Sequence, residues 1–361
     1  MKKIVLFLFI SVFLESVFAG GKVDSEYSAE SQPFKLSYKQ KKIEGESVEF
    51  SEVWGWVMKG REHELDNDFP LTDIGYFAAE VNSFGELADV PECAKLNSFS
   101  SRVHLVLVCD SRALTHFLLN PTFGLVDNFI QDVMIASEPF DGVQVDFELI
   151  PAEDRENFLS FLNTLSEKCK ENKKMFSVCV PARLRTISDD VFPYEEISKI
   201  ADKVMVMAYD EHWSTSKSGP VASVEWCEKI ADYATSVIPK EKLVMGLPFY
   251  GRTWANEKPA QGWYFSGINR IIREYKAGKV EYVEDVPYVN IDMKVHIDAW
   301  FEDSYSTVAK MRLYKSKNVE KIAFWRIGQE DPSVWKWIKV LPKKPEIDIE
   351  QNLADLAVSI D

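Results

Sequence analysis

The chain has 361 residues and a mass of 41.4 kDa, a length that allows one large domain or two ordinary ones. Hydrophobic residues make up 46% and charged residues 27% of it, a composition that excludes global disorder. The 42 Lys and Arg residues against 57 Asp and Glu leave a net charge of −15, so we expect no binding to nucleic acid or to anionic membranes.

The first residues have the pattern of a secretory signal peptide. A short basic segment, Met1-Lys2-Lys3, precedes an almost wholly apolar run over residues 4–14, and small residues follow up to Ala19. This order predicts a signal peptide over residues 1–19 with cleavage after Ala19, and it disfavours a buried first helix. The apolar run is too short to serve as a membrane anchor. We therefore expect an exported protein, periplasmic or extracellular, without membrane insertion.

Residues 20–46 are polar and rich in Lys, Ser and Glu, which predicts a linker that runs along the surface of the domain. The five cysteines include no C-x-x-C pair, so a zinc site or a thioredoxin-like site is not supported. An odd number leaves at least one free thiol, and the sequence does not choose a pairing. Residues 342–361 are acidic, which predicts a loose C-terminal tail.

Between residues 47 and 341, eight short apolar runs alternate with helical stretches. The runs are Val53–Met58, Ile74–Ala79, Val103–Cys109, Gly142–Glu148, Phe176–Pro181, Val204–Tyr209, Leu243–Phe249 and Ile322–Trp325. The clearest helical stretches are residues 154–172 and 224–237. Near-continuous apolar strands that alternate with helices predict an α/β fold, a (β/α)8 TIM barrel. The interval before the last strand is about twice the others, which predicts a small α+β insertion over residues 255–310, between strands 7 and 8.

The fourth predicted strand carries the main chemical signal. Strand side chains alternate between faces, so Gln144, Asp146 and Glu148 share one face and the apolar residues between them share the other. The apolar face suits the outer helices. The polar face therefore points into the barrel, with Glu148 nearest the carboxyl end, where barrel active sites lie.

Two carboxylates two residues apart on a strand lie within about 7 Å of each other at the backbone. The charge of one can hold the other protonated, as a general acid at neutral pH requires. A solvated polar edge strand is the alternative, which the intervening valines disfavour. A metal site is a further alternative, and no His accompanies the pair.

The segment Asp141-Gly-Val-Gln-Val-Asp146-Phe-Glu148 resembles the D-G-x-D-x-D-x-E signature of glycoside hydrolase family 18, the chitinase-like family. Three further segments at strand ends are similar to family motifs and follow in the same order: Met207-Ala-Tyr209-Asp210, Tyr250-Gly251-Arg252 and Phe324-Trp325. The resemblance covers approximately residues 48–340.

The resemblance implies three catalytic residues. Glu148 would protonate the glycosidic oxygen, and Asp146 would turn toward the acetamido N–H of the substrate. Tyr209 would donate its hydroxyl to the acetamido oxygen, which attacks the anomeric carbon in place of an enzymic nucleophile. This is the substrate-assisted route among retaining glycosidases.

The resemblance and the strand-end positions also imply a set of substrate-binding residues. They are Gln144, Met207, Asp210, Tyr250, Arg252 and Trp325, with Trp56, Trp213 and Trp254 as candidates for stacking on sugars. Structural alternatives remain open for several of them. The tyrosines and tryptophans could be core residues, Asp210 could cap a helix, and Arg252 could be an ion-pair partner.

The chain departs from the family pattern twice. Gln144 stands where the family usually has Asp, and we expect its amide to donate a hydrogen bond to Asp146. The third strand also lacks the family's S-x-G-G segment. In lacking this segment, the chain resembles bacterial family members that act on spores and cell walls more than it resembles typical chitinases.

We therefore predict an exported glycosidase that hydrolyses β-1,4 bonds of N-acetylglucosamine-containing glycans, with no cofactor and no metal, acting as a monomer. Chitooligosaccharide, peptidoglycan or an N-glycan core could be the substrate, and endo or exo action stays open. The alternative is a catalytically inactive chitinase-like carbohydrate-binding protein, which the retention of Glu148, Asp146 and Tyr209 disfavours.

Overall fold

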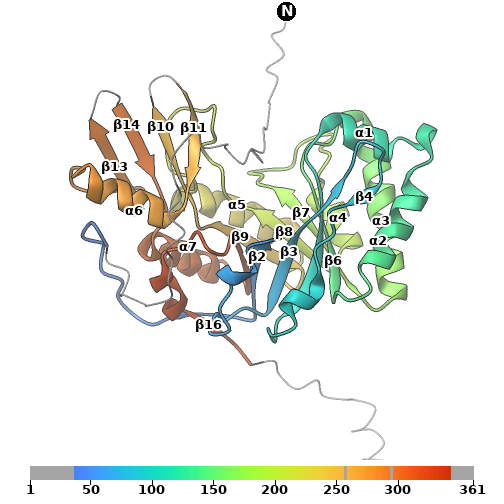
Figure 1. The fold of residues 1–361 in the computed structure, drawn as a ribbon, viewed down its shortest axis with the longest axis horizontal. Helices are drawn as coiled ribbons and strands as arrows, with labels where there is room; N and C mark the ends of the chain where they lie inside the picture. Colours follow the sequence, from blue (N-terminus) through green and yellow to red (C-terminus); the bar gives the residue numbers. More distant parts are fainter. Residues whose placement is uncertain (1–35, 256–257, 293–295, 343–361) are drawn as a thin grey trace, which may run out of the picture.

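The computed structural model describes residues 36–255, 258–292 and 296–342, and within them eight parallel strands form a closed barrel (Figure 1). The strands are β2 (Glu52–Met58), β3 (Asp73–Val81), β5 (Arg102–Cys109), β6 (Gly142–Phe147), β7 (Met175–Pro181), β8 (Lys203–Met207), β9 (Leu243–Pro248) and β15 (Lys321–Trp325). They pair in the order β2-β15-β9-β8-β7-β6-β5-β3, and β2 pairs with β3 to close the ring. The predicted barrel and its eight strands are confirmed.

Six helices connect the barrel strands and surround them. They are α1 (Arg112–Leu119), α2 (Val126–Ala136), α3 (Arg155–Glu171), α4 (Tyr194–Ile200), α5 (Val224–Val237) and α7 (Ser304–Ser316). The apolar stripe predicted for α3 is buried: Phe158, Phe161, Leu162 and Leu165 are at most 1% exposed. Helix α5 has the predicted bounds, and the Ser223 hydroxyl caps it by accepting from the N–H of Trp226.

Short elements complete the barrel domain. Strand β1 (Val48–Phe50) pairs in parallel with β16 (Ile338–Val340), and β4 (Leu87–Ala88) pairs antiparallel with β3. Single 3₁₀ turns occur at Glu62–Glu64, Cys93–Leu96, Pro121–Phe123, Ala152–Asp154 and Pro332–Trp337.

The apolar side chains form two layers because each barrel strand is buried on both faces. Outward residues such as Val143, Val145 and Phe147 pack against the helices. A smaller cluster fills the inside of the barrel and includes Trp54, Trp56, Phe77, Val106, Val108, Cys179, Met205, Val244 and Ala323. All five cysteines are buried, and none forms a disulfide.

An insertion follows β9. It contains the strands β10 (Gly251–Ala255), β11 (Lys258–Trp263), β12 (Glu281–Val283), β13 (Val286–Asp292) and β14 (His296–Trp300), and the helix α6 (Phe265–Glu274). The strands form one antiparallel sheet in the order β11-β10-β14-β13-β12, at the upper left of Figure 1. The sheet begins at Gly251 rather than at residue 255. Helix α7 belongs to the barrel, since the hydroxyl of its Tyr314 donates to the carbonyl of Gly246 in β9 (3.5 Å).

The described part of the N-terminal linker, residues 36–46, lies on the insertion and on the start of α7. The N–H of Ser37 donates to Asn269 (2.6 Å), and the hydroxyl of Tyr38 donates to Asp303 (2.8 Å). The predicted signal peptide, the rest of the linker and the predicted tail beyond Pro342 lie outside the described residues. Among the helices that are described, none is long and apolar enough to cross a membrane.

Candidate active site

Two carboxyl groups stand at the carboxyl end of β6. Asp146 faces into the barrel and is 6% exposed. Glu148 follows the strand directly, and its backbone N–H donates to the carbonyl of Cys109 at the end of β5 (3.4 Å). The Glu148 side chain is half-buried, and its carboxyl group accepts no hydrogen bond from the described residues. It is therefore open to a ligand that enters from this end of the barrel.

The surroundings of these carboxyl groups favour their protonated forms. Burial raises the pKa of Glu148 above its usual range, and the nearby negative charges of Asp146, Asp210 and Asp110 add to the effect. Burial also raises the pKa of Asp146, against a hydrogen bond with the Cys179 thiol. The Oδ1 atom of Asp146 has no hydrogen-bond partner within the described residues. A carboxyl group held protonated near neutral pH is suited to general acid catalysis.

Gln144 lies beneath the two carboxyl groups and is fully buried. Its Oε1 accepts a hydrogen bond from the indole N–H of Trp56 (2.6 Å), and its Nε2 donates to the hydroxyl of Ser177 (3.1 Å). An indole N–H can only donate, so the oxygen of the amide must face Trp56 and the nitrogen must face Ser177. The predicted hydrogen bond from Gln144 to Asp146 is therefore wrong. Its full burial also keeps Gln144 from contacting a substrate as predicted.

The opposite wall of the site comes from the ends of β8 and β9. The Oδ1 atom of Asp210 accepts hydrogen bonds from the Tyr250 hydroxyl (2.5 Å) and from Nη2 of Arg252 (2.6 Å). Arg252 is thus the ion-pair partner that holds Asp210, one of the alternatives the sequence left open. Asp210 has a φ of 62°, a left-handed conformation that Asp adopts more readily than most residues.

Tyr209 lies beside Tyr250, with ring centroids 6.3 Å apart in an edge-to-face arrangement. Its hydroxyl makes no hydrogen bond to a described residue, and burial keeps the pKa of this phenol well above its usual value. The hydroxyl is therefore a protonated donor available to a ligand. Gly246 makes room for this ring, because a Cβ atom there would lie 3.0 Å from Tyr209 Cε1 and 2.8 Å from the Val206 carbonyl oxygen.

Trp325 ends β15 and is half-buried. Phe77 packs edge-on against it, with ring centroids 4.8 Å apart, and Trp56 lies on another side at 5.8 Å. In the ring order, β15 lies opposite β6, with three strands between them on either side. The half-buried Met207 side chain packs against the apolar cluster inside the barrel. Trp325 can therefore support a sugar ring across from Glu148.

The structure changes the roles expected for two other tryptophans. Trp56 is 2% exposed, so its indole cannot offer a face to a sugar, and it holds Gln144 instead. Trp254 is 8% exposed, and its N–H donates to the carbonyl of Ser216 (3.1 Å), which makes it a packing residue of the loop after β8. Trp213 in that loop is half-buried and remains a candidate for sugar stacking.

Sequence reasoning missed two residues of β7 that complete the floor of the site. Ser177 binds Gln144, and Cys179 interacts with Asp146. Both lie at alternate positions of a strand whose other residues, Phe176, Val178 and Val180, pack outward. The alternation that identified the polar face of β6 could have identified these two as well.

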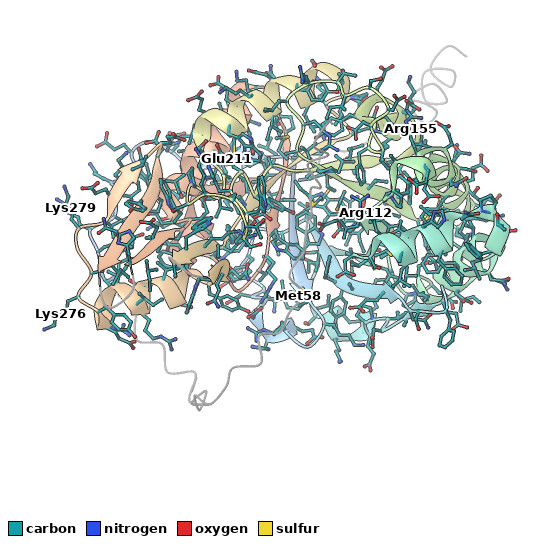
Figure 2. The ribbon with its side chains drawn as sticks, turned by 90° about the horizontal axis from the view of Figure 1, so that it is seen from above. Met58, Arg112, Arg155, Glu211, Lys276 and Lys279 are labelled. Atoms are coloured by element: carbon teal, nitrogen blue, oxygen red, sulfur yellow. The ribbon has the colours of Figure 1, made fainter. Side chains whose placement is uncertain are left out.

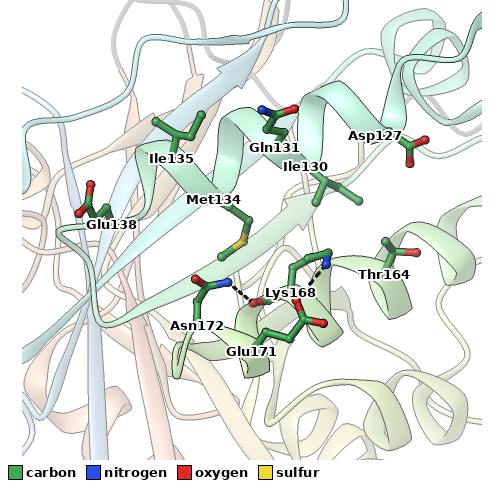
Figure 3. A pocket seen from close by; sticks show the side chains of 10 residues that line it. All are labelled: Asp127, Ile130, Gln131, Met134, Ile135, Glu138, Thr164, Lys168, Glu171 and Asn172. Atoms are coloured by element: carbon green, nitrogen blue, oxygen red, sulfur yellow. Dashed lines mark hydrogen bonds and ion pairs between the residues drawn. The ribbon is translucent and has the colours of Figure 1, made fainter.

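An open hollow between α2 and α3, drawn in Figure 3, contains none of these residues. Its lining is a mixture of charged residues with Ile130, Met134 and Ile135. No group of three or more His, Cys, Asp or Glu side chains in the described ranges could hold a metal ion. The groups described above at the barrel end are carboxyl groups, phenols and aromatic faces.

Comparison with known proteins agrees with this geometry. The model of the glycosyl hydrolases family 18 matches residues 125–330. A cortical fragment-lytic enzyme of Bacillus anthracis is 24% identical over 288 residues, which cover 74% of this chain and 67% of that enzyme. The uncharacterized glycosylase YvbX of Bacillus subtilis is 27% identical over 209 residues, 55% of this chain and 60% of its own length.

Among solved structures, the Bacillus cereus spore cortex-lytic enzyme SleL superposes with a TM-score of 0.74 at 22% identity, over 84% of this chain and 77% of that one. At this identity the superposition shows the shared fold. The cortex-lytic names of two of these relatives agree with the resemblance to the bacterial spore and cell-wall branch that the sequence predicted. Because the family model covers more than half of the chain, the chain belongs to glycosyl hydrolases family 18.

Proposed function

We propose that this glycoside hydrolase is exported and cleaves β-1,4 bonds next to N-acetylglucosamine with retention of configuration. The observation that carries the proposal is the Glu148 carboxyl group, which is free of internal hydrogen bonds and has a raised pKa at the open end of β6. Asp146 lies beside it on the same face of the strand, and Tyr209 presents a free hydroxyl from β8. The cortex-lytic names of the relatives favour peptidoglycan over chitooligosaccharide as the glycan.

The first step needs a proton on the leaving group and a nucleophile at the anomeric carbon. Glu148 gives its proton to the glycosidic oxygen, so the aglycone leaves as a neutral alcohol. Asp210 cannot serve as the nucleophile because Tyr250 and Arg252 both hold its carboxylate. The acetamido oxygen of the sugar above Trp325 attacks instead, while Tyr209 donates to that oxygen and Asp146 accepts from the acetamido N–H.

The second step returns the enzyme to its starting state. The ionised Glu148 now takes a proton from water, and that water opens the cyclic intermediate from the face that the aglycone left. Two inversions give net retention. Trp325 keeps the sugar over the site in both steps by apolar contact.

The test uses purified residues 20–361 as wild type and as Glu148→Gln. Both are incubated with chitooligosaccharides and with purified peptidoglycan, and the products are identified by mass spectrometry. We expect N-acetylglucosamine-terminated fragments from the wild type only. Glu171→Gln, which removes an exposed carboxylate on α3, serves as a control and should match the wild type.

Two other results would change the proposal. Binding of glycan without turnover by the wild type would indicate a carbohydrate-binding protein on the same barrel. Equal turnover by wild type and Glu148→Gln would show that Glu148 is not the acid.

The export component is tested separately. Expression of residues 1–361 in a secreting bacterial host should release the protein into the medium. The intact mass of the released protein should equal that of a chain that begins at Gly20. Retention in the cell with an unprocessed N-terminus would contradict export through residues 1–19.

A further inference from the structure

The segment between β8 and α5 carries two residues of the site, Tyr209 and Asp210, and its two ends are tied together. Asp210 has a left-handed backbone, a conformation that costs free energy and persists where surrounding contacts hold it. The next residue, Glu211, provides such contacts. Its N–H donates to the carbonyl of Val221 (2.9 Å), and its carboxylate accepts the N–H of Ser223 (2.8 Å). The loop is therefore closed at its base, directly beside Asp210.

The insertion holds the middle of the same loop. Three of its strands each contribute one hydrogen bond: the indole N–H of Trp254 to the carbonyl of Ser216 (3.1 Å), the N–H of Ala260 to the carbonyl of Ser214 (2.8 Å), and the indole N–H of Trp300 to the hydroxyl of Ser218 (2.9 Å). In Figure 2, the loop with the labelled Glu211 lies beside these strands. The position of the loop therefore depends on the position of the insertion.

A buried ion pair lies where the insertion returns to the barrel. Glu302 follows β14 and Lys310 lies in α7, and their side chains are 1% and 0% exposed. The Nζ atom of Lys310 is 2.6 Å from Oε2 of Glu302, which also accepts from the hydroxyl of Ser306 (2.6 Å). The same Nζ donates to the carbonyl of Ala222 at the base of the loop (3.2 Å). The pair thus joins the end of the insertion and α7 to the loop after β8.

Stability alone does not account for this ion pair. The cost of taking two charges out of water can exceed their attraction, and well-packed apolar residues at such positions often give an equally stable fold. Burial raises the pKa of Glu302 although the charge of Lys310 lowers it. An apolar side chain at position 310 would fill the space, but it could not bind the Ala222 carbonyl. The lysine therefore adds a directed contact to the base of the loop.

We propose that Lys310 and Glu211 are positioning residues of the glycosidase. They hold the base of the loop after β8, so that Tyr209 and Asp210 keep their places in the site. The proposal rests on the proposed glycosidase function and adds to it two residues that act through others. Tyr209 donates to the acetamido oxygen as that oxygen attacks, so a displaced loop weakens the transition state more than it weakens substrate binding. The effect should therefore fall on kcat rather than on KM.

The first test removes the buried pair without leaving a lone charge. The variants Lys310→Met and Lys310→Met/Glu302→Met are compared with the wild type on chitohexaose and on purified peptidoglycan. Ser306 keeps an acceptor in both variants, the carbonyl of Asp303 (3.1 Å). The matched control is Lys317→Met/Glu228→Met, which removes a partly exposed ion pair (2.8 Å) between α5 and the end of α7.

We expect Lys310→Met alone to lower the midpoint of urea unfolding, because it leaves Glu302 buried without a counter-charge. The double variant should regain the wild-type midpoint and still lose about tenfold in kcat, with KM within about threefold of the wild type. The control should keep the wild-type kcat. Wild-type kcat in the double variant would overturn the role of Lys310, as would an equal loss in the control.

A second pair of variants acts on the loop directly and leaves the buried pair intact. Glu211→Ala removes the acceptor of the Ser223 N–H, whereas Glu211→Gln keeps an acceptor oxygen there. We expect kcat to fall about tenfold in Glu211→Ala and to stay within about threefold of the wild type in Glu211→Gln. Equal kcat in these two variants would overturn the role of Glu211.

Hydrogen exchange separates this proposal from the catalytic one, because it needs no turnover. Amide exchange over residues 208–223 is measured by mass spectrometry in the wild type, in Lys310→Met/Glu302→Met and in the control. We expect about tenfold faster exchange of this segment in the Lys310→Met/Glu302→Met variant only, with exchange of α3 unchanged. Unchanged exchange over residues 208–223 overturns the proposal even if the chain is an active glycosidase. Absence of turnover by the wild type, with faster exchange in the variant, contradicts the proposed function and leaves the loop contact of Lys310 supported.

Discussion

At the scale of single residues, the site is a set of polar groups that the fold leaves incompletely satisfied. Glu148 accepts no hydrogen bond from a described residue, and Asp146 Oδ1 has no partner there. Burial raises the pKa of both carboxyl groups, so the folded protein prefers them protonated. A group with a raised pKa stabilises the fold fully below its unfolded pKa, near 4.3 for Glu, and loses that contribution as the pH rises through the folded value.

Glu148→Gln should therefore stabilise the protein at pH 8, because an amide carries no charge to bury. The expected gain in the free energy of unfolding is of order 1 kcal/mol, since one pKa unit corresponds to about 1.4 kcal/mol. Urea unfolding at pH 8 and at pH 4 measures it, and the gain should disappear at pH 4. A gain of the same size at both pH values would argue against the raised pKa. Glu171→Gln should show no comparable gain.

Gln144→Asp places a carboxyl group beneath Asp146, between Trp56 and Ser177. A second negative charge there should raise the pKa of Asp146 and of Glu148 further. We expect retained activity with the pH profile of kcat/KM moved to higher pH, measured on a chromogenic N-acetylglucosamine oligosaccharide. A profile that coincides with the wild type would mean that position 144 has no electrostatic influence on the pair.

At the scale of elements, one charged network joins the insertion to the barrel near the site. Glu64, in the 3₁₀ turn after β2, forms ion pairs with Arg61 and with Arg326, and both arginines contact the Tyr264 hydroxyl at the start of α6. Glu64 and Arg326 are each only 9% exposed as side chains. Arg326 follows Trp325 directly, so the network also fixes the end of β15.

Gly328→Ala tests this network. Gly328 has a φ of 88°, and a Cβ atom there would collide with the Glu64 carboxylate. We expect the free energy of unfolding to fall by about 2 kcal/mol or more, from backbone strain together with the displaced ion pairs. Gly262→Ala is the matched control, since a Cβ there meets nothing within 4 Å. Equal denaturant midpoints for the two variants would show that the network tolerates the added methyl group.

The elements also show how far the sequence could predict the molecule. The barrel strands were identified because burial on both faces leaves long apolar runs, whereas the insertion has short strands that begin at Gly251, directly after β9. The pair Asp146 and Glu148 could be predicted because it needs only the alternation of side chains along β6. The partners of Gln144 could not be predicted, since Trp56 and Ser177 come from two other strands. A tryptophan at a strand end has the same sequence signal whether it faces the cleft, as Trp325 does, or packs beneath it, as Trp56 does.

At the scale of the whole molecule, the N-terminal segment ties distant parts of the chain together. Tyr38 packs edge-on against Phe301, with centroids 5.6 Å apart, and its hydroxyl donates to Asp303, which also caps α7. Gln40 bonds Ser304 and Asp331. A segment without helix or strand thus holds the insertion against the last barrel helix.

Tyr38→Ala should release this connection. We expect a loss of about 2 kcal/mol in the free energy of unfolding and faster proteolysis within the insertion, from the lost apolar contact with Phe301 and the lost hydrogen bond to Asp303, whose Oδ2 keeps the Tyr282 hydroxyl as a donor. Limited trypsin digestion followed by mass spectrometry measures the cleavage sites. Glu44→Ala, at a side chain that is 75% exposed, leaves every trypsin site in place and should digest like the wild type. Cleavage at unchanged rate in Tyr38→Ala would mean that the insertion is held by other contacts.

The pairing of the first barrel strand with the last has a consequence for the order of events in biosynthesis. Strand β2 lies between β3 and β15, and the Ser51–Glu320 contact beside it joins residues 269 positions apart. Until α7 and β15 have been synthesised, one edge of β2 has no neighbouring strand and the barrel cannot close. Such long-range closure is slow. A barrel that stays open until β15 has been synthesised can still pass unfolded through a narrow secretory channel, as the proposed export would require.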